Sequence, residues 1–103
     1  MTLASSRDAP QVVRRRLLVR GVVQGVGYRY AMVEAAQAAR VVGWVRNRRD
    51  GSVEAIVQGD GAAVLAIVAW CERGPAGARV DAVEVTDVAA DDTLAGFDVR
   101  ASA

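Results

Sequence analysis

The chain has 103 residues, enough for one hydrophobic core and too few for two domains. Apolar residues make up 52% of it, which excludes wholesale disorder, and no apolar run reaches the length of a membrane-spanning helix. Histidine and lysine are both absent, so His-based triads and Schiff-base chemistry are excluded. All 13 basic residues are arginine, which binds anions but does not shuttle protons.

Charge is distributed unevenly although the net charge is only +1. Residues 1–50 hold ten arginines and three acidic residues, a balance of +7, and residues 51–103 have a balance of −6. A basic half is compatible with nucleic acid or with a small anionic substrate. We interpret the Arg14-Arg15-Arg16 run as a solvated lead-in to the first strand, without a role in a site.

The ends of the chain and its single cysteine indicate where the protein works. Residues 1–10 are polar and lack the apolar middle of a signal peptide, so we expect a flexible tail at 1–13 and one domain at 14–103. Cys71 is the only cysteine and cannot form an internal disulfide, which suits a reducing compartment. We therefore expect a cytoplasmic protein, monomeric at this size, with no membrane partner.

The first half of the domain predicts a strand, a helix and a hairpin. Leu17–Val22 is rich in β-branched residues and predicts a buried strand. After Tyr28 the apolar positions follow a helical period, at Met32, Ala35, Ala36 and Ala39. Residues 41–47 and 52–58 predict two strands joined by a turn at Asp50-Gly51.

The second half predicts a helix and two further strands. Asp60 is expected to cap a helix that ends at Gly74-Pro75. That helix carries an apolar stripe, with Cys71 as a small core residue: Val64, Ile67, Val68, Cys71. Residues 76–80 are expected to form a loop, followed by a strand marked by Val83, Val85 and Val88. A short final strand is expected at 97–99.

This β-α-β-β-α-β order predicts an α+β fold of the ferredoxin-like, split βαβ type. We expect an antiparallel sheet with both helices on one face and a short extra C-terminal strand. The first strand should be central, and the first helix should cross over to a neighbouring parallel strand.

The stretch Arg20–Arg29 is the most informative part of the chain. It places three glycines within seven residues between a strand and a helix, with Arg29 where the helix begins. Unpaired N–H groups at a helix start, the positive end of the helix dipole and a guanidinium together suit a phosphate-sized anion. The spacing matches neither the dinucleotide fingerprint nor a Walker loop, and a purely structural turn is the alternative.

A second polar block lies in the predicted hairpin. Side chains alternate along a strand, so Val45 and Asn47 should share one face and Trp44 and Arg46 the other. Asn47 offers both a donor and an acceptor where the hairpin could approach the anion loop.

Together the two blocks resemble the paired signature of the acylphosphatases, over roughly residues 17–97. The motifs are Gly21-x-Val23-Gln24-Gly25-Val26-Gly27-Tyr28-Arg29 and Gly43-Trp44-Val45-Arg46-Asn47-x-x-Asp50-Gly51-x-Val53-Glu54. The resemblance implies metal-free, cofactor-free hydrolysis of the carboxyl–phosphate bond of acyl phosphates, by in-line attack of water. It also implies a phosphate-binding loop formed by Gln24, Gly25, Val26, Gly27 and Tyr28. Arg29 would then bind substrate, and Asn47 would position the water.

The sequence departs from the family pattern in two places. Tyr28 stands where the family often has Phe, and we expect no change of chemistry because the two share a ring. The end, Arg100–Ala103, lacks the terminal aromatic that many members carry, which puts packing of the last strand in doubt.

Three other functions fit parts of the pattern. A binding module could hold a phosphorylated ligand without turnover, although Asn47 beside Arg29 argues for a positioned water. Acylphosphatase-like domains within larger maturation proteins channel carbamoyl phosphate, which the end of the chain just after the domain disfavours. An RNA-binding sheet is disfavoured because no strand carries an aromatic-x-aromatic cluster, so we expect no nucleic acid partner.

Overall fold

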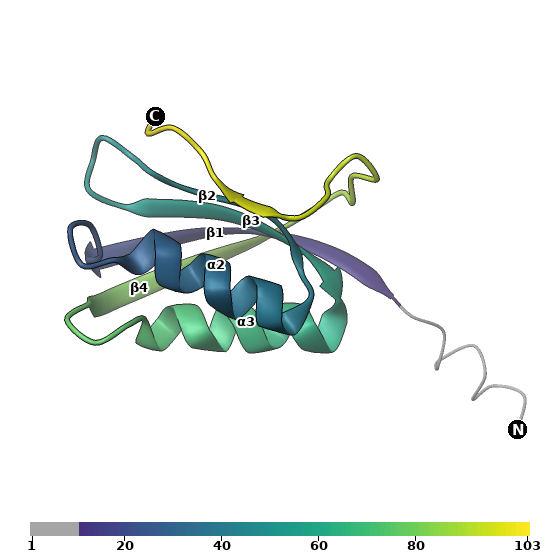
Figure 1. The fold of residues 1–103 in the computed structure, drawn as a ribbon, viewed down its shortest axis with the longest axis horizontal. Helices are drawn as coiled ribbons and strands as arrows, with labels where there is room; N and C mark the ends of the chain where they lie inside the picture. The colour runs from purple at the N-terminus through teal and green to yellow at the C-terminus, as the bar shows by residue number, and fades with distance from the viewer. Residues whose placement is uncertain (1–10) are drawn as a thin grey trace, which may run out of the picture.

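The computed structural model describes residues 11–103 and confirms the predicted order of elements (Figure 1). Most of the expected tail, 1–13, lies outside the described residues, and Val12 and Val13 belong to the first strand. The elements are β1 (Val12–Val22), α2 (Tyr28–Ala39), β2 (Val42–Asn47), β3 (Val53–Asp60), α3 (Gly61–Arg73), β4 (Arg79–Val88) and β5 (Phe97–Val99).

The strands form one sheet in the order β4-β1-β3-β2-β5. β1 pairs antiparallel with both β3 and β4, and β3 pairs antiparallel with β2. The expectation that β1 and its parallel partner are neighbours is wrong, because β3 lies between β1 and β2. β5 pairs parallel with β2, so the sheet is mixed where an antiparallel sheet was expected.

Both helices pack on one face of this sheet, as predicted (Figure 1). The core between them is made of apolar side chains on alternate strand positions and on the inner helix faces. Its largest fully buried members are Tyr28, Leu17, Met32, Val19, Val23, Val45, Val53, Val57, Val64 and Cys71. Cys71 is therefore a core residue, as predicted, and burial raises the pKa of its thiol to about 12.

β1 begins five residues earlier than the sequence predicted, so the solvated lead-in assigned to residues 14–16 is wrong. The three arginines are half-buried within the strand, and each guanidinium has a partner. Arg15 pairs with Asp87 at 2.7 Å and Arg16 with Glu54 at 2.7 Å, while Arg14 donates to the carbonyl of Ala89. Arginine tolerates this position because its aliphatic stem packs along the sheet while its charged end is paired.

The ends of α3 match one of two sequence predictions. Gly74, with φ 68°, terminates the helix as expected, and its N–H donates to the carbonyl of Trp70. Asp60 occupies the N-cap position but makes no side-chain capping bond, and it is also the last residue of β3. β4 begins at Arg79, inside the predicted loop.

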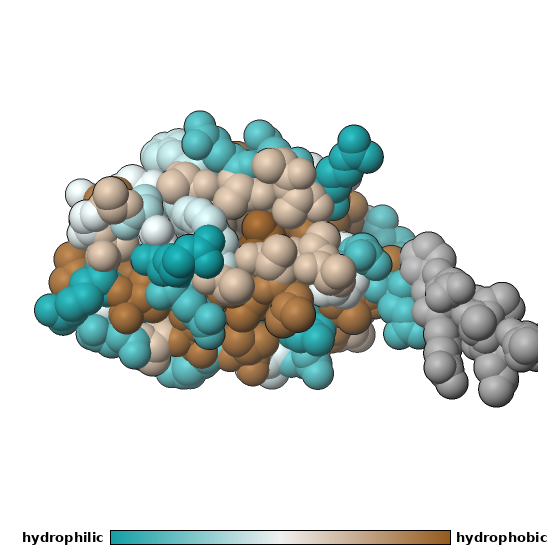
Figure 2. All heavy atoms as spheres, turned by 90° about the horizontal axis from the view of Figure 1, so that it is seen from below, coloured by the Kyte–Doolittle hydropathy of each residue, from teal (hydrophilic) through white to brown (hydrophobic). Residues whose placement is uncertain are grey.

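The helix side of the surface mixes hydrophobic and charged residues. Seen from below the view of Figure 1, hydrophobic patches alternate with hydrophilic ones (Figure 2). Leu65 on α3, with 69% of its surface accessible, is one of the exposed hydrophobic residues. No helix in residues 11–103 is long and apolar enough to span a bilayer.

Candidate active site

The loop between β1 and α2 has its glycines in left-handed backbone conformations. Gly25 and Gly27 both have φ 78°, which costs a residue with a side chain conformational energy. A Cβ added to either glycine would meet nothing within 4 Å, so the space beside the loop is open. The glycines are therefore needed for the path of the backbone, which turns sharply into the helix.

This path leaves the start of α2 with uncapped N–H groups. Gly27 is the N-cap and has no side chain to offer, and the first turn contains no acidic residue. The first bond of the helix runs from the Ala31 N–H to the Gly27 carbonyl, at 3.1 Å. The N–H groups before Ala31 in the helix therefore lack helical partners and lie at the positive end of the helix dipole.

Gly21 is required for a different reason, the close approach of a neighbouring strand. It lies at an irregularity in the pairing of β1 with β4, and its φ is 136°. A Cβ at this position would collide with the Arg79 carbonyl oxygen of β4. This glycine allows the strand to bend beside its neighbour just before the loop begins.

Arg29 lies in the first turn of α2 and is half-buried. Its guanidinium carbon is 5.7 Å from the centre of the exposed Tyr30 ring. None of the ion pairs formed within residues 11–103 involves Arg29. A permanent positive charge without a carboxylate partner thus lies at a helix start that already favours anions.

The side chains of Val26 and Tyr28 are directed into the protein instead. Val26 packs against the core, and Tyr28 is 1% exposed. The Tyr28 hydroxyl donates to the Cys71 carbonyl at 2.7 Å, and the ring meets Trp70 edge-on at 5.3 Å between centroids. Burial also raises the pKa of the Tyr28 hydroxyl far above its ordinary value. Because both side chains are engaged inside the protein, only the backbone of these two residues can serve a bound anion.

Asn47 is the last residue of β2 and pairs with Val53 of β3. It shares a sheet face with Val45, which is fully buried in the core beneath the helices, so Asn47 lies on the helix side. Its side-chain oxygen, Oδ1, is buried and has no hydrogen-bond partner within the described residues. A buried acceptor without a donor costs free energy, and it can be satisfied by a bound molecule.

The strand end that carries Asn47 is well fixed despite the missing C-terminal aromatic. Arg100 donates its N–H to the Val45 carbonyl at 2.8 Å, so the backbone beyond β5 continues alongside β2. Ala103 donates to the Asn47 carbonyl at 3.0 Å and accepts from the Arg49 N–H at 2.8 Å. The doubt about packing of the last strand is thus resolved by main-chain bonds, which need no aromatic residue.

One side chain joins the two sequence blocks. The Gln24 side-chain nitrogen, Nε2, donates to the carbonyls of Arg48 at 2.8 Å and Ser52 at 2.9 Å. The loop before α2 and the turn between β2 and β3 accordingly lie at the same end of the sheet (Figure 1). The sequence predicted Gln24 as part of the loop but gave no sign of this contact.

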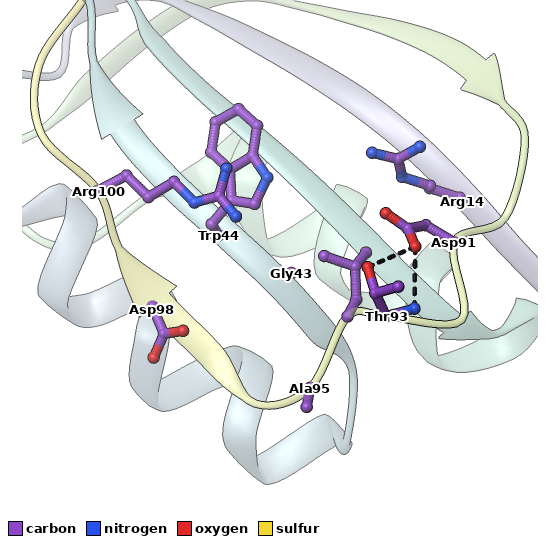
Figure 3. A pocket seen from close by; sticks show the side chains of 9 residues that line it. Arg14, Gly43, Trp44, Asp91, Thr93, Ala95, Asp98 and Arg100 are labelled. Carbon is purple, nitrogen blue, oxygen red and sulfur yellow. Dashed lines mark hydrogen bonds between the residues drawn. The ribbon is translucent and has the colours of Figure 1, made fainter.

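A pocket of about 400 Å³ lies elsewhere, on the sheet face that Trp44 occupies (Figure 3). It is lined by Arg14, Gly43, Trp44, Asp91, Thr93, Leu94, Ala95, Asp98 and Arg100. None of the site residues predicted from the sequence lines it. Asp91 is occupied within its own turn, because its carboxylate accepts bonds from the N–H and hydroxyl of Thr93 at 2.9 and 2.6 Å.

The same sheet face carries a cluster centred on Glu54, which is 5% exposed. Three guanidinium groups surround this carboxylate: Arg16 at 2.7 Å, Arg46 at 2.7 Å and Arg48 at 3.1 Å. Burial alone would raise the pKa of Glu54, but the bonds from Arg16 and Arg46 outweigh it and hold that pKa below its ordinary value. We call these four residues the Glu54 cluster.

Known proteins resemble this chain over most of its length. A family model described as "Acylphosphatase" matches residues 15–99. The chain is 50% identical over 97 residues to an acylphosphatase of Aeropyrum pernix, covering 93% of this chain and 94% of the relative. It is 56% identical over 78 residues to an acylphosphatase of Nitrobacter hamburgensis, covering 76% and 79%.

Solved structures show the same similarity in three dimensions. The crystal structure of acylphosphatase from Bacillus subtilis superposes with a TM-score of 0.82 at 32% sequence identity. The match covers 85% of this chain and 98% of that one. The range matched by the family model, residues 15–99, includes both helices and the loop and hairpin of the candidate site.

Proposed function

The chain belongs to the acylphosphatase family, and from that premise we propose how it hydrolyses small acyl phosphates to a carboxylate and inorganic phosphate. The reaction breaks the bond between phosphorus and the bridging oxygen. The carboxylate leaves with the electron pair of that bond, and it is a good leaving group without protonation. A chain without histidine is suited to this reaction because little acid catalysis is required.

The phosphoryl group is bound by the loop of residues 24–28 together with Arg29. Backbone N–H groups at the start of α2 donate to the phosphoryl oxygens, and the guanidinium supplies two parallel donors and a full charge. Phosphoryl transfer depends mostly on positioning and charge stabilisation, which this arrangement supplies without a metal or other cofactor. The open space beside Gly25 and Gly27 leaves room for the group.

Asn47 positions the attacking water. Its buried Oδ1 accepts a hydrogen bond from the water and aims the water oxygen at phosphorus, opposite the leaving carboxylate. A carboxamide is too weak a base to take the proton, so the proton passes to a phosphoryl oxygen of the substrate. The product is then inorganic phosphate, with one oxygen from water.

One observation supports this mechanism above all: Oδ1 of Asn47 is buried on the helix side without a hydrogen-bond partner among the described residues. Asn47 directly precedes the β2–β3 turn, which Gln24 connects to the phosphate-binding loop by two hydrogen bonds. The alternative of a non-catalytic binding module is not favoured by the comparisons.

Hydrolysis of acetyl phosphate in ¹⁸O-labelled water, with EDTA present, tests the mechanism. We expect turnover to continue in EDTA and the label to enter phosphate but not acetate. Label in acetate would mean attack at the carbonyl carbon and would remove Asn47 from its role. Loss of turnover in EDTA, restored by a divalent metal, would show that the site is incomplete without a metal.

The proposal also covers the compartment, the oligomeric state and the partners of the protein. We expect a cytoplasmic monomer that acts on a small molecule and needs neither nucleic acid nor membrane. The single buried cysteine and the small size support this view. Light scattering at micromolar concentration should give the mass of one chain, and turnover should be unchanged by added RNA or by vesicles.

A further inference from the structure

The Gln24 side chain makes a contact that the proposed mechanism does not yet use. It is half-buried, and its Nε2 directs both N–H bonds at carbonyls of the β2–β3 turn. These carbonyls belong to Arg48 and Ser52, 24 and 28 residues farther along the chain. The contact therefore connects two separate parts of the site.

The β2–β3 turn that Gln24 contacts is held by its own hydrogen bonds. The Arg48 N–H donates to the Ser52 carbonyl at 2.9 Å, and the Gly51 N–H donates to the Arg48 carbonyl at 3.1 Å. Asp50 accepts bonds from both the N–H and the hydroxyl of Ser52, at 3.0 and 2.6 Å. Because the turn holds its own shape, its remaining freedom is movement as a unit relative to the anion loop.

Asn47 lies at the junction of β2 with that unit, directly before Arg48, so a shift of the turn reaches its side chain although its carbonyl is held by the Ala103 N–H. Arg48 is held from two sides, because Gln24 binds its carbonyl and Glu54 binds its guanidinium at 3.1 Å. The second link between β1 and the turn, Arg20 to Asp50 at 3.6 Å, is exposed and weak. Among the described side-chain contacts, Gln24 thus makes the strongest link between loop and turn.

We propose that Gln24 is a positioning residue, whose side-chain amide sets the separation between the phosphate-binding loop and the Asn47 carboxamide. This inference rests on the proposed function, in which Asn47 aims a water at phosphorus. A displacement of about 1 Å in such a geometry can cost about 10² in rate. Phosphate affinity should be spared, because the loop N–H groups and Arg29 are untouched.

Gln24→Met tests this role because methionine keeps the length of the side chain and removes both donors. We expect kcat on acetyl phosphate to fall by about 10- to 100-fold. The inhibition constant of inorganic phosphate should be unchanged. Gln37→Met is the matched control, because Gln37 is exposed on α2 and should affect neither quantity.

Gln24→Glu adds a pH readout that a purely structural contact would not give. The ionised carboxylate would repel both carbonyls, whereas the protonated acid supplies one O–H donor. The protonated form should therefore be the more active one. Activity relative to the natural chain should rise as pH falls through the pKa of the new carboxyl group.

Nuclear magnetic resonance separates failure of this inference from failure of the proposed function. On adding inorganic phosphate to Gln24→Met, we expect the loop amides to shift as in the natural chain, while the shift of the Asn47 side-chain NH₂ is lost. This readout does not need turnover. An unchanged kcat with only a lowered melting temperature, or an undiminished Asn47 shift, would overturn the positioning role. Absence of hydrolysis by the natural chain would overturn the function itself.

Discussion

Two parts of the molecule use arginine in opposite ways. In the Glu54 cluster, three guanidinium groups share one buried carboxylate at 2.7 to 3.1 Å. At the start of α2, Arg29 has no carboxylate partner among the described residues and adjoins uncapped N–H groups. The first arrangement neutralises charge within the fold, and the second leaves charge available for an external anion.

The difference shows why arginine content alone does not locate a site. Five of the ten arginines in the first half of the sequence lie in the strands that the structure describes, where carboxylates and a carbonyl of the second half accept their bonds. Strand pairing thus cancels part of the charge asymmetry along the chain. What distinguishes Arg29 is its position beside a glycine loop and a helix start.

Replacing Arg29 by methionine should have the largest effect on activity. Loss of a preorganised charged donor at the phosphoryl group predicts a fall in kcat/KM of about 10³. The melting temperature should stay near that of the natural chain, because no ion pair is broken. Steady-state hydrolysis of acetyl phosphate measures kcat/KM, and thermal unfolding measures the melting temperature.

Arg46→Met is the matched control for Arg29→Met. It removes the same charge from the Glu54 cluster, so stability should fall and turnover should not. An equal loss of turnover in both variants would mean that overall charge, rather than the location of Arg29, drives catalysis.

Asn47→Ala should reduce kcat by about 10², because the water loses the acceptor that orients it. The inhibition constant of phosphate should change little, which separates this variant from the one at Arg29. Steady-state kinetics with phosphate as inhibitor makes the distinction. Retention of more than about a tenth of kcat is too small a loss for an oriented water and would exclude the assigned role.

Glu54→Gln should destabilise the fold by about 2 kcal/mol, since the amide cannot satisfy three guanidinium groups. The pKa of Glu54 is lowered on folding, so its contribution is fully present above the ordinary value of 4.5 and is lost as pH falls through the lower folded value. The stability gap between natural and variant chains should therefore narrow below pH 4.5. Urea unfolding at neutral and acid pH measures this gap, and a constant gap would contradict the assignment.

Tyr28→Phe should have the smallest effect, a loss of about 1 kcal/mol from the bond between its hydroxyl and the Cys71 carbonyl. Turnover should be unchanged, because only the backbone of this residue faces the loop. Urea unfolding and the acetyl phosphate assay check both expectations. A large loss of turnover would mean that the hydroxyl takes part in the reaction.

The sequence predicted the elements of the fold better than their pairing. Apolar periodicity located both helices and the β2–β3 hairpin, because burial imposes a period of 3.6 or 2 on the residues themselves. It did not reveal that β3 lies between β1 and β2, since alternation defines faces and not neighbours. Arg14–Arg16 did not suggest a strand because three consecutive charged residues are usually solvated. The carboxylates that pair with them in the sheet, such as Glu54 and Asp87, are distant in sequence.

The candidate site shows the same limit. The positive φ of the loop glycines could be predicted because only that residue type adopts it readily, and Arg29 and Asn47 are proposed for the site because their chemistry and motif are distinctive. The bridging role of Gln24 could not, because its partners are main-chain carbonyls, which carry no residue signature.

Titration of inorganic phosphate into ¹⁵N-labelled protein, followed by nuclear magnetic resonance, locates the anion-binding site without the need for turnover. We expect saturable shifts of the backbone amides of residues 25–29 and of the Asn47 side chain, absent in Arg29→Met and retained in Arg46→Met. Shifts confined to the Glu54 cluster, with the loop amides unmoved, would show that the anion does not bind at the start of α2.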